Sequence, residues 1–222
     1  ERWTELCRAY GTQPHVVKVE WGRSVEPAHI KKLLDADKAV KAVFVTLCET
    51  STAVTHPVQK LAALTQKTGA LLFVDAISGL ACDPLKMDDW GVDVVVCGSQ
   101  KGFMLPPGLA FVAVNERAQS LITTSKTPKY YFNFSETIKA LKKNDTPFTS
   151  AVSLYRGLDE ALVMLLEEGI ENVWKRHSEI AAWTRAKVTG LGLELFSKAP
   201  SNGLTAIVMP SGVSSKDVIN HM

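Results

Sequence analysis

The sequence lacks the features that mark membrane proteins, secreted proteins and binders of polyanions. Its 222 residues contain no apolar run near the roughly 18 to 20 residues that span a bilayer, and the opening ERWTELCRAYG lacks the apolar core of a signal peptide. Basic residues never form a block longer than a pair, and 25 Lys and Arg against 23 Asp and Glu leave a formal charge of +2. We therefore expect neither a membrane nor a nucleic acid as a partner.

Cysteine is scarce as well. The four cysteines, Cys7, Cys48, Cys82 and Cys97, form no CxxC pair, and two of them lie in strand-like apolar runs. This pattern favours buried free thiols in a reducing compartment over a disulfide or a zinc site, and we expect no metal site. No GxGxxG or GxxxxGK[ST] motif follows a predicted strand, which argues against a nucleotide-binding domain.

Hydrophobic patterns predict alternating strands and helices over much of the chain. Apolar runs predict strands at 15–21, 41–50, 70–76, 92–101 and 108–115, and helical spacing predicts helices at 2–10, 26–37 and 57–69. Strands that are apolar on both faces and alternate with helices are typical of a parallel or mostly parallel sheet covered by helices. The sequence therefore predicts an α/β fold.

The pattern changes near residue 158. Residues 158–192 predict one long or kinked helix that Gly169 interrupts, and the segments LELF and LTAIVMP predict a strand pair after it. Ser215 or a neighbour is suited to cap a final helix. We divide the chain into 1–157, the central part of a large domain, and 158–222, a linking helix with an incomplete smaller domain.

Polar residues follow three of the predicted strands. They are Cys48 to Thr52 after the first, Asp75 after the second, and Ser99 to Lys101 after the third. In parallel sheets, ligands bind beyond the carboxyl ends of the strands, so these residues are expected to share one edge.

A lysine and an aspartate at such an edge suit a cofactor of the pyridoxal phosphate type. The amine of Lys101 can react with an aldehyde, and the carboxylate of Asp75 can keep a ring nitrogen protonated. Two structural interpretations remain open at this point. Lys101 can extend to solvent from the strand end, and Asp75 can cap the turn or helix that follows it.

Three motifs carry a resemblance to a known family. ETST at 49–52, FVDAISGL at 73–80 and GSQK…PPG at 98–108 occur in that order. Over about residues 41–118 the sequence resembles the class V pyridoxal-phosphate aminotransferases, specifically the alanine–glyoxylate and serine–glyoxylate group. The resemblance implies the type I fold of pyridoxal-phosphate transferases, whose large domain binds the cofactor and whose smaller C-terminal domain is α+β.

The resemblance assigns roles to four residues near the strand ends. Lys101 would form the Schiff base with pyridoxal 5'-phosphate and move a proton at the substrate α-carbon. Asp75 would pair with the pyridine nitrogen, and Ile77 would pack beneath the ring. The hydroxyl of Thr50 would reach the phenolic oxygen of the cofactor.

The resemblance also implies contacts to the phosphate. Gln100 matches one such contact, and Ser99 is a weaker candidate. Thr146, in NDTPFT, resembles the segment that reaches the cofactor phosphate of a neighbouring subunit. A homodimer with shared active sites is therefore implied.

The sequence departs from the family at several positions. Ala53 stands where members of this group often have glycine, a change that an ordinary φ would tolerate. Lys143 stands where some relatives have tyrosine, and His56 is interpreted as loop surface. No segment matches the small-residue phosphate loop, the stacking aromatic or the substrate-binding arginine of the family. We expect the chain to be the central part of a longer protein.

The expected function is transfer of an amino group from alanine or serine to glyoxylate by a ping-pong Schiff-base mechanism, with small amino acids and 2-oxo acids as substrates. A cytoplasmic location is expected, and a peroxisomal one remains open for a eukaryotic source. One alternative is a non-catalytic or truncated scaffold or subunit of the same fold. Another is an enzyme like the cysteine desulfurases, which usually carry histidine where this chain has Gln100.

Overall fold

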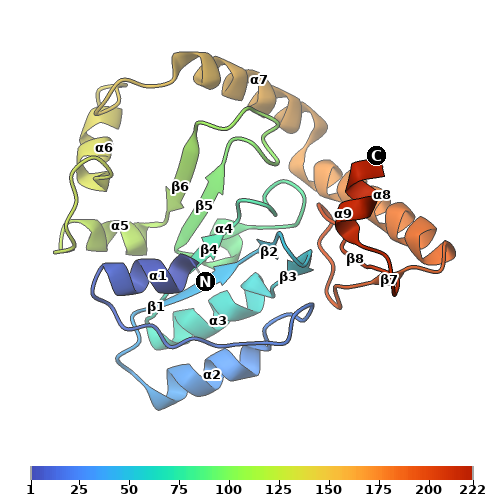
Figure 1. Ribbon diagram of the computed structural model, residues 1–222. Coiled ribbons are helices and arrows are strands. Elements are labelled where there is room, and N and C mark those ends of the chain that lie inside the picture. The colour runs from blue at the N-terminus through green and yellow to red at the C-terminus, as the bar shows by residue number, and fades with distance from the viewer. Residues whose placement is uncertain (1, 222) are drawn as a thin grey trace.

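A four-stranded sheet in the order β1-β4-β5-β6 forms the centre of the molecule (Figure 1). The computed structural model describes residues 2–221. Strands β1 (Ala42–Thr46), β4 (Leu71–Asp75) and β5 (Val94–Gly98) are parallel, whereas β6 (Ala110–Val114) runs antiparallel to β5. The prediction of a mostly parallel sheet is therefore confirmed.

The two faces of this sheet are covered differently. Because side chains alternate along a strand, every second residue faces α3 (Val58–Thr68), and these residues join the helix in the buried core. The opposite face carries Phe44 and Phe73, whose ring centroids are 4.7 Å apart. Trp3 of α1 (Arg2–Ala9) lies 4.9 Å from the Phe44 ring. The core residues are Val45, Leu47, Val58, Leu61, Ala62, Leu72, Val74, Ala76, Val92 and Val95.

Two predicted strands differ from the structure. Residues 15–21 are irregular, and Trp21 is 74% exposed, since the alternating apolar pattern there has no neighbouring strand to pair with. The run 41–50 is broken at Leu47, and β2 (Cys48–Glu49) instead forms a hairpin with β3 (Val54–Thr55). The predicted helix at 26–37 is α2 (Pro27–Ala36), which packs on α3.

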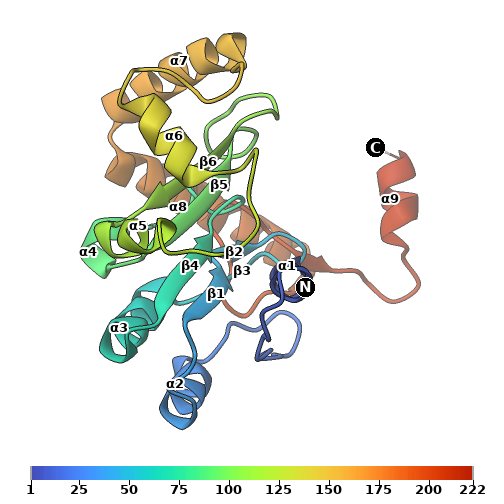
Figure 2. The same cartoon turned by 90° about the vertical axis from the view of Figure 1, so that its left-hand side faces the viewer.

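The second half of the chain is mostly helical. Helices α5, α6 and α7 follow one another around the β6 side of the sheet, and α9 stands apart from the other elements (Figure 2). Gly169 separates α7 from α8, as predicted, and the hydroxyl of Ser214 caps α9 by accepting from the Lys216 N–H. The predicted domain boundary at 157/158 falls inside α7 and stays a prediction. The remaining elements are α4 (Met87–Trp90), α5 (Glu116–Ile122), α6 (Phe134–Leu141), α7 (Val152–Glu168), α8 (Ile170–Gly190), β7 (Glu194–Leu195), β8 (Ile207–Val208) and α9 (Ser215–His221).

None of the helices within residues 2–221 combines the length and the apolar character that crossing a bilayer requires.

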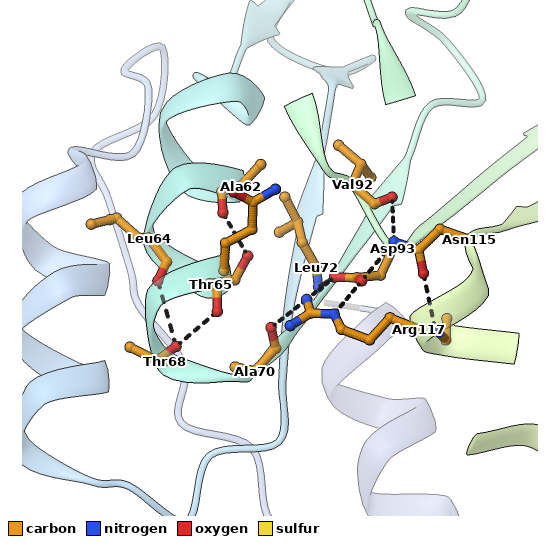
Figure 3. A network of polar contacts seen from close by, with 12 residues as sticks. Ala62, Leu64, Thr65, Thr68, Ala70, Leu72, Val92, Asp93, Asn115 and Arg117 are labelled. Carbon is orange, nitrogen blue, oxygen red and sulfur yellow. Dashed lines mark hydrogen bonds and ion pairs between the residues drawn. The ribbon is translucent and has the colours of Figure 1, made fainter. Parts of the chain in front are cut away.

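A buried ion pair fixes the amino-terminal ends of β4 and β5 (Figure 3). The fully buried Asp93 carboxylate accepts two bonds from Arg117, at 2.6 and 2.8 Å. It also accepts from the Leu72 N–H at 2.7 Å and from the Asn115 amide at 2.9 Å. Burial opposes ionisation, but these donors hold the pKa of Asp93 below its usual value. The network ties β4, β5 and the start of α5 together at the end of the sheet opposite Asp75.

Candidate active site

Asp75 ends β4 between two neighbouring parallel strands. It pairs in register with Thr46 of β1 and Val96 of β5. The side chain is half-buried, and its Oδ1 accepts the Ile77 N–H at 3.0 Å. Within residues 2–221 the carboxylate makes no other hydrogen bond or ion pair, so it keeps the capacity to accept from a bound group.

Lys101 lies in a loop that begins at the end of β5 and is closed by Ser99. The fully buried Ser99 hydroxyl donates to the Pro106 carbonyl at 2.7 Å and accepts from the Leu109 N–H at 3.2 Å. The Lys101 carbonyl accepts from the Met104 N–H at 2.9 Å, while its side chain is exposed. In the described part of the chain, the Lys101 amine has no hydrogen-bond or ion-pair partner.

Two glycines bring this loop, the turn after β4 and the β2 hairpin into contact. A Cβ at Gly102 would overlap the carbonyl oxygen of Leu80. A Cβ at Gly79 would lie 2.9 Å from the side chain of Leu47, just before β2, and 3.1 Å from the Cβ of Cys48 in β2. Larger residues at either position would push the segments apart. The backbone approach at Gly102 therefore sets Lys101 beside the turn that follows Asp75.

Thr50 lies in the turn of the β2–β3 hairpin. Its hydroxyl is 2.5 Å from the hydroxyl of Ser78, which lies three residues after Asp75. Ala53 completes the turn with a φ of +55°. The expectation of an ordinary φ at Ala53 is therefore wrong, because this hairpin closes through the left-handed region that glycine adopts without strain.

The family model described as aminotransferase class-V matches residues 1–222. The chain belongs to the class V aminotransferase family.

Individual relatives show how far the similarity extends. The chain is 38% identical to a protein named soluble hydrogenase, small subunit, from Synechococcus sp., over 98% of this chain and 58% of that one. It is also 38% identical to serine–glyoxylate aminotransferase of Hyphomicrobium methylovorum, and the match covers 97% of this chain and 56% of that protein. The crystal structure of alanine–glyoxylate aminotransferase from Nostoc sp. matches with a TM-score of 0.94 and 26% sequence identity. The match covers 99% of this chain and 59% of that one. The chain thus spans less than two thirds of each of these proteins, and the predicted fold class is confirmed.

In this class V chain, the hairpin that carries Thr50 is completed by a distant segment. The Thr55 N–H donates to the Ala199 carbonyl at 2.8 Å, and the Ser201 N–H donates to the Ala53 carbonyl at 2.9 Å. The buried Asp83 holds this segment, because its carboxylate accepts from the Ser201 hydroxyl at 2.5 Å and from the Asn202 N–H at 2.8 Å. Burial raises the pKa of Asp83.

The interpretation of His56 as loop surface is wrong. The ring is half-buried, and its Nδ1 accepts the Val25 N–H at 3.1 Å. Burial lowers the pKa of His56, so the neutral ring that this bond requires is favoured. His56 thus joins the start of α3 to the segment before α2.

The predicted site residues fall into three groups. Asp75, Thr50 and Lys101 lie at one edge of the sheet, and in the sequence Ile77 lies two residues after Asp75 and Gln100 directly precedes Lys101. Ser99 is buried, and both of its side-chain bonds lie within its own loop, so the structure gives its assignment as a phosphate contact no support. Thr146 lies after α6, and its hydroxyl donates to the Phe148 carbonyl at 2.7 Å. No hydrogen bond of Thr146 within residues 2–221 reaches the strand ends.

Sequence reasoning missed Ser78, Asp83 and Ser201. Ser78 stands in the quoted FVDAISGL motif as a small polar residue just after a strand end, which was a usable signal. The bond between Asp83 and Ser201 joins residues 118 apart, and no local pattern indicates it.

Proposed function

We propose that this class V family member is a transaminase that uses pyridoxal 5'-phosphate to move an amino group from alanine or serine to glyoxylate. The observation that carries the proposal is the placement of Lys101 and Asp75 at the carboxyl ends of adjacent parallel strands. Family membership makes amino transfer the reaction that this pair serves best. A non-catalytic scaffold is not favoured, because both side chains keep free bonding capacity at this edge.

The residues at the strand ends fit such a cofactor. Asp75 presents a carboxylate with one oxygen that accepts no hydrogen bond within residues 2–221, and the Lys101 amine has no partner there. The Thr50 hydroxyl is bonded only to Ser78 in the same part of the chain. These groups suit a protonated ring nitrogen, an aldehyde and a phenolic oxygen, respectively. Ile77 would pack against the ring, and Gln100 would contact the phosphate.

Each residue then has a definite task. When bound, the cofactor supplies an aldehyde carbon that accepts amino groups and a ring that draws electrons from the substrate α-carbon. Lys101 would bind the cofactor and afterwards take the proton from the substrate α-carbon and pass it to the former aldehyde carbon of the cofactor. Asp75 would hold the proton on the ring nitrogen, since a nearby negative charge favours the protonated form.

The substrate proposal follows the names of the relatives. The relative from Hyphomicrobium methylovorum is named serine–glyoxylate aminotransferase, and the similar crystal structure is named alanine–glyoxylate aminotransferase. Glyoxylate is the acceptor common to both names. We propose it as the 2-oxo acid acceptor, with alanine or serine as the donor.

A second copy of the chain is the proposed partner. A cluster of aromatic side chains is exposed around α6, and two of its rings, Tyr131 and Phe148, stack with centroids 4.4 Å apart. Exposed aromatic clusters of this kind are typical of protein interfaces. Thr146 lies beside the cluster, and we propose that it contacts the cofactor phosphate in the partner subunit. The cluster consists of Tyr130, Tyr131, Phe132, Phe134 and Phe148.

Reduction and peptide mapping test the proposal. The full-length protein is loaded with pyridoxal 5'-phosphate and treated with borohydride, which makes a lysine–cofactor bond permanent. We expect the label on Lys101 and none in Lys101→Ala. Lys126 and Lys143 are internal controls, and a label on either of them in place of Lys101 would refute the assignment.

The substrate proposal is tested by measuring the rate of glycine formation from glyoxylate with alanine, serine or aspartate as the amino donor. Failure of both alanine and serine to support glycine formation would refute the substrate proposal.

A further inference from the structure

The hydroxyls of Thr50 and Ser78 form a pair at the candidate site. Their oxygens are 2.5 Å apart, although the residues are 28 positions apart in the sequence. Thr50 is exposed and Ser78 is half-buried. Within residues 2–221 neither hydroxyl has another hydrogen-bond partner. The orientation of the Thr50 hydroxyl therefore depends on Ser78.

Ser78 is the better fixed member of the pair. The Leu80 and Gly79 N–H groups both donate to the Ala76 carbonyl, at 2.9 and 3.2 Å, which closes the turn around Ser78. The buried Gly79 also packs directly against Leu47, so that even a Cβ would be too close. A tight turn that is held against the sheet end is a stable base for orienting the side chain of a neighbouring hairpin.

The pair has two arrangements with different chemical consequences. A hydroxyl has one proton to donate and two lone pairs that accept. If Thr50 donates to Ser78, Thr50 offers only lone pairs to a ligand. If Ser78 donates to Thr50, the Thr50 proton remains free to bond an anionic oxygen, and each bond in the chain strengthens the other.

We propose that Ser78 is a positioning residue that donates its proton to Thr50, so that Thr50 donates to the phenolic oxygen of the cofactor. This inference rests on the function proposed above. Ser78 touches neither cofactor nor substrate in this arrangement and acts only through Thr50. Removing its hydroxyl should therefore weaken cofactor binding, and the loss should disappear when Thr50 has already been removed.

A double-mutant cycle on the full-length protein tests this coupling. Cofactor dissociation constants and the pH titration of the visible cofactor band are measured for wild type, Ser78→Ala, Thr50→Val and the double variant. We expect each single variant to bind about three to ten times more weakly, the effect of one hydrogen bond. The double variant should match Thr50→Val, and the pH midpoint of the band should shift in Ser78→Ala.

Two controls accompany the cycle. Ser51→Ala removes a hydroxyl from the same turn that instead donates to Glu49 at 2.8 Å, and it should leave both readouts unchanged. Ser78→Thr keeps the hydroxyl and should recover wild-type affinity. If Ser78→Ala proves unfolded by thermal melting, the comparison moves to Ser78→Cys, whose weaker donor should give an intermediate affinity.

The outcomes separate this inference from the proposed function. Wild-type affinity in Ser78→Ala would overturn the role of Ser78, and so would an additive loss in the double variant. Either result would leave the proposed function intact, provided that Lys101 is labelled by borohydride in the wild-type protein. If Lys101 is not labelled in the wild-type protein, the proposed function, on which the inference rests, is refuted instead.

Discussion

The backbone at Gly102 lies against the carbonyl oxygen of Leu80, with no room for a Cβ between them. This approach joins the loop after β5 to the turn after β4. Lys101 is adjacent to the contact on one side, and Asp75 precedes it by five residues on the other. The relative position of the two proposed catalytic groups thus depends on the absence of one methyl group.

Gly102→Ala should separate Lys101 from Asp75. The added methyl meets backbone, which cannot rotate away, so the loop must shift. We expect cofactor affinity to fall by about tenfold or more, because small displacements at a preorganised site are costly. Gly190→Ala is the matched control, since nothing lies within 4 Å of its Cβ, and it should bind normally. Absorbance titration measures both, and normal affinity in Gly102→Ala would contradict the argument.

Asp75→Asn should lower turnover with little change in the fold. The amide keeps an oxygen for the Ile77 N–H but loses the charge proposed to hold the ring nitrogen protonated. We expect kcat to fall by about 100-fold or more, at the scale of a lost acid–base function. Asp159→Asn, an exposed position on α7, is the control. A kcat for Asp75→Asn close to wild type would rule out the assigned role.

Asp93→Asn should destabilise the protein and change its response to acid. The carboxylate accepts four hydrogen bonds, and asparagine offers only one oxygen for them. We expect a loss of about 3 kcal/mol in the free energy of unfolding. Because the folded pKa of Asp93 is lowered, its contribution is present above the unfolded carboxyl pKa and is lost as pH falls through the folded value. Urea unfolding between pH 7 and pH 3 should therefore show a flatter acid dependence in the variant than in wild type. Parallel curves would contradict the prediction.

Asp83→Ala should release the segment that completes the Thr50 hairpin. The substitution leaves the Ser201 hydroxyl and the Asn202 N–H without their acceptor, at a cost of about 2–4 kcal/mol. Hydrogen exchange should then accelerate at residues 199–202 and at Thr55, whose N–H donates to this segment. Exchange at β4 serves as the internal reference and should change less. Uniform acceleration across both regions would show that Asp83 supports the whole fold and not this segment.

The predictable parts of the fold are those that local patterns of apolar and polar residues specify. The helix at 57–69 and the strands at 70–76 and 92–101 are correct because apolar spacing and burial coincide there. The shared edge of Asp75 and Lys101 followed from the general rule for parallel strands. The apolar pattern at 15–21 predicted a strand that does not form, because a strand also requires a neighbouring strand with free backbone N–H and C=O groups.

Other features depend on contacts that no local pattern specifies. The apolar run 41–50 gives no sign that it breaks at Leu47. The Leu47 N–H donates to the backbone carbonyl of Asp75, and the Leu47 carbonyl accepts from the His56 N–H. The positive φ of Ala53 follows from the hairpin that this break creates. Thr50 could be assigned by resemblance, but its bond to Ser78 depends on how two separate turns are packed together.

The long-range bond between Thr55 and Ala199 implies an order of assembly during synthesis. Asp75 and Lys101 leave the ribosome 101 − 75 = 26 residues apart, so their strands can pair early. The hairpin that carries Thr50 must wait for a segment 144 residues further along the chain. At about 5–20 residues per second, that interval is roughly 7 to 30 s. Until then, the nascent chain exposes an unfinished hairpin edge, which is the kind of surface that chaperones bind and that neighbouring chains can pair with.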